Sequence, residues 1–166
     1  PPIPEAGVIA PIVNGVSIQP GNDDSRQASL RSRKGENMVA GNVVTEKDGV
    51  PVLYDSCKRG FGVRVVHPQN EKAPSKNLSA TLLYLAPGGV LEPHDHENEE
   101  IYFFLEGEGE GTFGLGESTA VEKGVFVHLP PHAEHGLKNT GKEVMIVMIA
   151  TSPVLPAFPE WVAQTH

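Results

Sequence analysis

The amino-acid sequence predicts an all-β domain built as an antiparallel sandwich or barrel. Short runs of β-branched and apolar residues recur from Met38 onward, and Gly, Pro, Asn or Asp residues separate them. No apolar repeat of 3.6 residues continues for more than ten residues. Many short strands without alternating helices are typical of antiparallel architectures. With 166 residues and 39% hydrophobic content, the chain suits one domain with a buried core.

Several runs have the length of a strand. They are residues 42–45, 60–66, 80–85, 101–105, 124–129 and 144–149, and a further strand-like stretch runs from His135 to near Asn139. We expect turns at Asp48-Gly49 and at Pro87-Gly88-Gly89. Residues 109–114 match the pattern G-x-G-x-x-G, but no helix follows them, so we interpret these glycines as part of a hairpin.

The chain divides into three segments by composition. Residues 1–37 form a Pro- and Gly-rich arm, residues 38–150 form the β domain, and residues 151–166 form a docking tail that carries Phe158 and Trp161. No apolar run approaches the roughly 20 residues of a membrane helix, and no leader pattern is evident, so we expect no membrane partner and a cytoplasmic location. The single cysteine, Cys57, excludes an internal disulfide.

Charge argues against a nucleic-acid partner. The formal net charge is −8, and residues 78–166 hold three Lys or Arg against thirteen Asp or Glu. Such a surface would repel a phosphate backbone. A bound divalent cation would offset part of the charge, and small neutral or cationic substrates would not be opposed.

Two histidines and a carboxylate form a candidate metal site. His94 and His96 are one residue apart, so on a strand both rings face the same side. A turn follows, and Glu100 opens the next apolar run, so a hairpin would return its carboxylate to the two rings. Glu97 and Glu99 are similar candidates, but hairpin parity favours Glu100. Two imidazoles and one carboxylate are ligands of non-haem iron and of zinc.

These residues resemble the two sequence motifs of the cupin family. The first motif, G-x5-H-x-H-x3-E-x6-G, matches Gly88, His94, His96, Glu100 and Gly107. The second, G-x5-P-x-G-x2-H-x3-N, matches Gly124, Pro130, His135 and Asn139, with His132 where the pattern expects glycine. Histidine tolerates positive φ better than most residues, so we expect this turn to be retained.

The resemblance implies a cupin jelly-roll β-barrel, also called a double-stranded β-helix. It implies one divalent metal ion, Fe, Mn, Zn or Ni, held by His94, His96, Glu100 and His135. Small cupins are commonly dimers, so we expect a homodimer.

Alternation along the strands suggests which side chains line the cavity. With Glu100 pointing inward, Tyr102 and Phe104 also point inward. Phe126 and His128 share a parity, and in one register they line the same cavity. His128 and His132 are candidates for proton transfer or for hydrogen bonding to substrate. Tyr102 is a third catalytic candidate.

The function expected from this site is a metal-dependent enzyme that acts on a small oxygen-rich or aromatic molecule. An Fe(II) dioxygenase is the first interpretation. A non-oxidative isomerase, lyase or cyclase that uses Zn, Mn or Ni is the alternative, and a non-catalytic cupin that binds a small molecule is a third. The fold does not choose among them.

Overall fold

The computed structural model describes residues 40–114 and 116–154. Almost all of them belong to the second of two units into which the chain divides, Asn42–His166. The expected arm, residues 1–37, lies outside the described residues, as do Phe158 and Trp161 of the expected tail.

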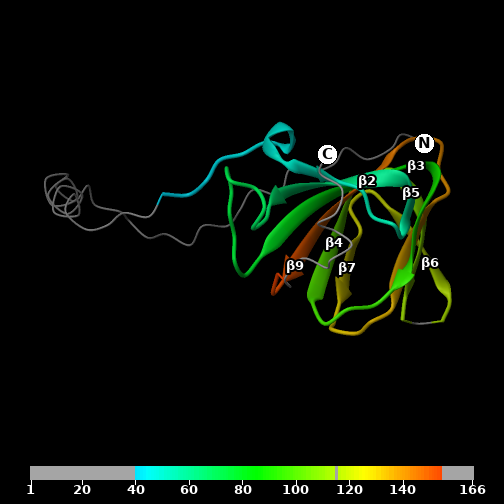
Figure 1. Cartoon of the computed structure of the whole chain (residues 1–166). Helices are drawn as coiled ribbons and strands as arrows, with labels where there is room; N and C mark the ends of the chain where they lie inside the picture. The colour runs from blue at the N-terminus through cyan, green and yellow to red at the C-terminus, as the bar shows by residue number, and fades with distance from the viewer. Residues whose placement is uncertain (1–39, 115, 155–166) are drawn as a thin grey trace, which may run out of the picture. The chain divides into compact units, whose positions relative to one another are not determined.

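The described residues form nine β-strands and one short 3-10 helix (Figure 1). In chain order they are η2 (Glu46–Asp48), β1 (Val50–Val52), β2 (Cys57–Val66), β3 (Ser79–His94), β4 (Glu99–Glu106), β5 (Glu108–Phe113), β6 (Ser118–Glu122), β7 (Phe126–Leu129), β8 (His135–Asn139) and β9 (Met145–Ser152). β9 therefore includes Thr151 and Ser152, which the sequence assigns to the tail. No helix among the described residues is long and apolar enough to cross a membrane.

The long strand β3 joins two parts of one curled sheet. Its first half pairs with β9, and the sheet continues through β4 to β7. Its second half pairs with β8, and the sheet continues through β5 to β6. β2 pairs along the other edge of β3, so the strands curl around a common interior (Figure 1). The all-β jelly-roll barrel expected from the sequence is confirmed, as is the β5–β6 hairpin.

Two expectations about strands are wrong. Pro87-Gly88-Gly89 does not separate two strands but lies within β3, where Gly88 has a φ of +73° and the pairing with β2 is interrupted. The chain bends there and stays extended. Residues 42–45 form no strand, and Val43 is 99% exposed. β propensity depends on a partner strand to pack against, and these residues pair with none.

The inner face of the sheet changes from apolar to polar toward one end. Leu83, Val147 and Phe104 form one cross-strand row in the hydrophobic core. The row that starts with Thr81 contains Ile149 and Tyr102, and the row after it contains Ser79, Thr151 and Glu100. Cross-strand neighbours on one face lie side by side, so this gradient places polar groups next to a closed apolar core.

The cupin-motif glycines occupy positions with a left-handed backbone, at the bend inside β3 for Gly88 and between strands for Gly107 and Gly124. Gly88, Gly107 and Gly124 have φ values of +73°, +85° and +90°. His132 stands where the motif has glycine and has a φ of +63°. The expectation that histidine retains this turn is therefore confirmed, since the position keeps the left-handed conformation that glycine adopts most easily.

Asn139, the last residue of the second motif, closes the turn between β8 and β9. Its side-chain amide donates to Leu85 O and to Glu143 O, both at 2.8 Å, and its side-chain oxygen accepts a bond from Gly141 N at 2.9 Å. The residue is fully buried, so these bonds satisfy polar groups that would otherwise be costly to bury.

Candidate metal centre

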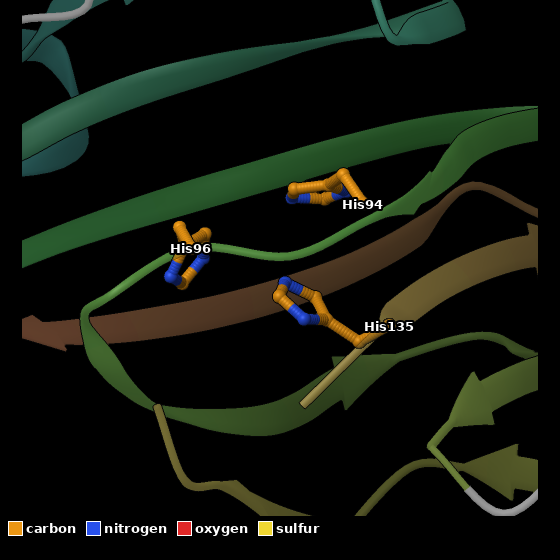
Figure 2. Close-up of side chains that lie close together, drawn as sticks. All are labelled: His94, His96 and His135. Carbon is orange, nitrogen blue, oxygen red and sulfur yellow. The ribbon is translucent and has the colours of Figure 1, made fainter. Parts of the chain in front are cut away.

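Three histidines, at the end of β3, in the segment after it and at the start of β8, point toward one another (Figure 2). One ligand nitrogen from each of His94, His96 and His135 lies within 4.8 Å of the others. The ring centroids are 4.3 Å apart for His94 and His135 and 4.9 Å apart for His96 and His135. Three imidazoles that gather in this way could together hold one metal ion.

The backbone explains why the rings meet. His94 ends β3 and lies directly opposite His135, which begins β8. A Cβ on Gly136 would stand 2.9 Å from Pro93 N and 3.0 Å from Leu91 O, so glycine allows β8 to approach β3 closely there. His96 follows the end of β3, and its carbonyl accepts a bond from His132 N at 2.8 Å, which holds this segment beside the β7–β8 turn.

Backbone carbonyls fix the tautomers of two of the rings. His94 Nδ1 lies 2.8 Å from Glu92 O, and His135 Nδ1 lies 2.8 Å from Ala133 O. A carbonyl only accepts, so each Nδ1 carries the proton and each neutral ring keeps its lone pair on Nε2. His135 Nε2 is buried and has no hydrogen-bond partner. This orientation of a ring by a carbonyl is typical of metal-ligating histidines.

Glu100 lies beside these rings as expected, but β3 and β4 do not form the hairpin that was expected to bring it there. β3 and β4 do not pair with each other, because β9 lies between them. The carboxylate nevertheless approaches His96 Nε2 and His135 Nε2, with 3.5 Å to each, and accepts a 2.9 Å bond from the Thr151 hydroxyl. The hairpin expectation is wrong, because the segment between β3 and β4 crosses over the end of β9.

The surroundings favour the deprotonated forms of Glu100 and His94. Burial favours a higher pKa for Glu100, but the adjoining imidazoles of His135 and His96 outweigh it and lower the pKa to about 2. Burial lowers the pKa of His94. Contact with Glu100 raises the pKa of His96, against the opposing effect of burial.

This donor set fits a divalent metal. Deprotonated carboxylate and neutral imidazole are the forms that bind cations. His135 Nε2 is buried, lies 3.5 Å from the Glu100 carboxylate and forms no hydrogen bond of ordinary geometry, so a cation between the two groups would satisfy both. The ligand atoms of His94, His96 and His135 therefore form one group that could hold the ion, and Glu100, 3.5 Å from two of these rings, is a fourth candidate outside that group. The sequence predicts a bound metal ion, and the structure supports this prediction in part, because the three predicted histidine ligands lie together.

A cavity of about 350 Å³ opens beside the cluster. This volume is within the range of sites for small molecules. The lining residues come from β2, β3, β4, β9 and the connecting segments; they include Tyr54, Arg64, His67, Thr81, Leu83, Leu91, His94, His96, Asn98, Glu100, Tyr102, Ile149 and Thr151.

Two aromatic residues expected on the cavity wall differ in position. Tyr102 lines the cavity, and burial raises the pKa of its hydroxyl well above the ordinary value. Phe104 points inward as expected but is fully buried in the core, in the row with Leu83 and Val147, and does not line the cavity. The expectation for Phe104 is wrong because the cavity ends one row before it.

The other three candidates lie outside the cavity. Phe126 is 66% exposed and stacks on Phe103 at 4.1 Å, and His128 is exposed and lies 2.6 Å from Glu99. The sequence analysis considered a register of β7 in which Phe126 and His128 face inward. In the structure Val127 and Leu129 face inward instead. His132 is also exposed, with Nδ1 3.7 Å from Asp95. These placements contradict the lining role of Phe126 and His128 and leave neither histidine facing the cavity.

The sequence analysis missed the polar residues contributed by the first half of the domain. Arg64 and Tyr54 line the cavity from β2 and from the segment before it. A Cβ on Gly62 would stand 2.8 Å from the Tyr54 hydroxyl, so this glycine leaves room for the ring inside the barrel. One signal was present: Arg64 interrupts the otherwise apolar run of residues 60–66, between Val63 and Val65.

His67 offers a test of stability against pH. Burial lowers its pKa to about 4 from 6.5, and the Arg64 charge acts in the same direction. A pKa depressed in the folded state gives stability that is present above pH 6.5 and lost as the pH falls toward 4. In urea titrations between about pH 7 and about pH 5, we expect the free energy of unfolding to fall more steeply for the wild type than for His67→Gln. Equal slopes would contradict this role of His67.

Comparisons with known proteins agree with this geometry. The family model of the cupin domain matches residues 81–151. Gentisate 1,2 dioxygenase 1 of Aquipseudomonas alcaligenes is 31% identical over 114 residues, which are 67% of this chain and 30% of that protein.

Two solved structures share the fold. The polyketide cyclase RemF of Streptomyces resistomycificus has a TM-score of 0.58 at 17% identity, over 72% of this chain and 88% of that chain. A predicted oxalate decarboxylase of Thermotoga maritima has a TM-score of 0.58 at 20% identity, over 68% and 99% of the two chains.

The fold and the site together define a jelly-roll barrel with a histidine cluster at one end of its interior. Residues 81–151 are a cupin domain by the family model, and the solved structures share its fold.

Proposed function

We propose that this cupin is a metal-dependent enzyme that acts on a small oxygen-rich or aromatic molecule, and that it is an Fe(II) dioxygenase. The observation that carries the proposal is the convergence of three imidazoles and one buried carboxylate beside a cavity of about 350 Å³. Ligands of these types with open positions are shared by non-haem iron oxygenases.

The chain's own residues prepare the site for a chelating substrate. His94, His96, His135 and Glu100 would hold the metal, and Thr151 orients the carboxylate. A bound divalent metal would supply Lewis-acid activation of substrate oxygens and, as iron, reactivity toward O₂. Leu83, Leu91 and Ile149 line the cavity with apolar surface and exclude water from its floor.

Tyr102 is placed to act next to the metal ligands. Its hydroxyl is fully buried and contacts Glu100, and its raised pKa keeps it protonated near neutral pH. It therefore serves as a hydrogen-bond donor inside the cavity rather than as a base. The sequence similarity to a gentisate dioxygenase supports the oxidative chemistry over the alternatives.

Metal content and oxygen uptake test this function together. The purified protein is analysed for metals, and oxygen consumption is then followed on a panel of enediols, diketones and catechols that includes gentisate. We expect iron and substrate-dependent oxygen uptake. Turnover that persists without oxygen would instead assign a non-oxidative isomerase, lyase or cyclase that uses Zn, Mn or Ni. Tight retention of a ligand without turnover would assign a binding protein.

The homodimer and the cytoplasmic location remain predictions. The outer face of β4 and β7 carries Ile101, Phe103 and Phe126, and two of these side chains are more than 40% exposed, at 43% for Ile101 and 66% for Phe126. A second copy would bury such apolar surface. Sedimentation velocity is expected to show a dimer that Phe126→Glu weakens, and a wild-type monomer at all concentrations would contradict the expectation.

A further inference from the structure

A buried arginine lines the same cavity as the candidate metal centre. Arg64 is 2% exposed, and among the described residues of the lining it is the only Arg or Lys. Its guanidinium donates to the side-chain oxygen of Gln69 and to the Tyr54 hydroxyl, which hold it against the cavity wall. A permanent cation is therefore built into the cavity wall at a site that the proposed chemistry does not use.

The strand register places this cation at a defined separation from the metal ligands. Arg64 pairs with Thr81, Thr81 with Ile149, and Ile149 with Tyr102, so the four side chains form one row across β2, β3, β9 and β4. Three strand spacings of about 4.8 Å separate the backbones of the first and last residue, or roughly 14 Å. Glu100 lies in the next row toward the histidines. Because the sheet curls, the straight distance across the interior is shorter than this path along the sheet, and the cavity of about 350 Å³ limits the ligand to a small molecule.

We propose that Arg64 is the carboxylate-binding residue of this cavity, so that the substrate is a small carboxylic acid held between the guanidinium and the metal ligands. This inference rests on the proposed function and narrows its substrate class. A planar guanidinium presents paired N–H donors that match the two oxygens of a carboxylate. In a cavity largely shielded from water, such a pair is stronger than on the surface.

The net charge of the chain does not oppose this assignment. The formal charge of −8 is spread over the whole molecule. Charges on exposed surfaces are largely screened beyond about 8 Å at physiological ionic strength. Three carboxylates, Asp55, Asp95 and Glu100, also line the cavity; Asp55 and Asp95 are exposed, and a metal ion bound beside Glu100 would offset the charge of that carboxylate. The Arg64 charge already acts on the lining, because it contributes to the lowered pKa of His67.

An arginine that only stabilised the loop after β2 would behave differently. Gln69 lies in this loop, which Asn70 also holds through a 2.6 Å bond to Val65 O. A purely structural Arg64 would affect the free energy of unfolding, yet it would not discriminate an acid from its amide. The affinity ratio between acid and amide is therefore the readout that separates the two roles.

Paired probes test the inference by calorimetry. Benzoate, salicylate, gentisate and succinate are each compared with the corresponding neutral amide, on chelator-treated protein and on metal-loaded protein. We expect at least one acid to bind the wild type at least roughly tenfold more tightly than its amide, in both forms of the protein. Arg64→Gln is expected to abolish this preference and to leave the metal content unchanged.

Matched variants control for charge and for folding. Arg59→Gln removes the same charge from an exposed position on β2 and is expected to keep the preference. If Arg64→Gln does not fold, Arg64→Lys decides, because lysine keeps the charge and loses the paired donors. It is expected to bind the acid more weakly and the amide unchanged.

The outcomes separate this inference from the proposed enzyme. Failure of every acid to bind the wild type in preference to its amide would overturn the inference, as would an undiminished preference in Arg64→Gln or Arg64→Lys. Turnover of a neutral substrate, without any preference for the acid, would contradict the role of Arg64 and leave the proposed enzyme standing. An Arg64-dependent preference in a protein that binds no metal would support the inference and remove the proposed enzyme.

Discussion

Replacing His96 with alanine is expected to abolish stoichiometric metal binding. His96 and Glu100 lie 3.5 Å apart, and the ring also meets His135 at a centroid distance of 4.9 Å, so the variant removes one nitrogen from the centre of the donor set. Loss of a group that merely orients a ligand weakens metal affinity 10–100-fold in comparable sites, so loss of a ligand is expected to weaken it by more than roughly 100-fold. Elemental analysis after dialysis measures the effect.

Two other histidines serve as controls for His96→Ala. His128 and His132 are both exposed and lie outside the cavity lining. His128→Ala and His132→Ala are therefore expected to retain the wild-type metal content. Metal content that is unchanged in His96→Ala, or lost equally in all three variants, would contradict the site.

Replacing Phe104 with alanine is expected to cause the largest loss of stability. The side chain is fully buried in the core beneath the cavity, next to Val147 in the row that also contains Leu83. Truncation of a buried phenylalanine removes its transfer free energy and leaves a cavity, which costs about 3–5 kcal/mol. Urea denaturation followed by circular dichroism measures the change in the free energy of unfolding.

Phe126→Ala is the matched control for Phe104→Ala. Phe126 is 66% exposed, and its main contact is the stack on Phe103. An aromatic pair of this kind contributes about 0.5–1.5 kcal/mol beyond the area that it buries, so at dilutions where the protein is monomeric the control is expected to lose less stability than Phe104→Ala. A loss for Phe126→Ala equal to the loss for Phe104→Ala would contradict the register of β7.

The sequence predicted the histidine cluster well, because both the residue types and their spacing point to one site. The alternation of His94 and His96 and the motif position of His135 predicted three rings that the fold brings together. His132 also kept the left-handed turn that the motif requires. Local pattern was sufficient here because a strand fixes which side each residue faces.

Long-range pairing was the part that the sequence could not supply. Phe126 and His128 alternate correctly along β7, but parity alone does not say which face is inside, and the pairing with β4 decides it. In the same way, nothing local indicates that β9 separates β3 from β4 or that Arg64 shares a row with Tyr102. Contacts between strands distant in the chain create the cavity.

The metal centre is tested most directly by X-ray absorption spectroscopy at the edge of the bound metal. We expect one metal ion per chain with a first coordination shell of nitrogen and oxygen and with the multiple-scattering pattern of three imidazoles, which His94, His96 and His135 would provide. Metal–nitrogen distances near about 2.0–2.1 Å are typical if the ion is zinc. Absence of bound metal after loading, a sulfur ligand, or fewer than two imidazoles would contradict this account of the protein.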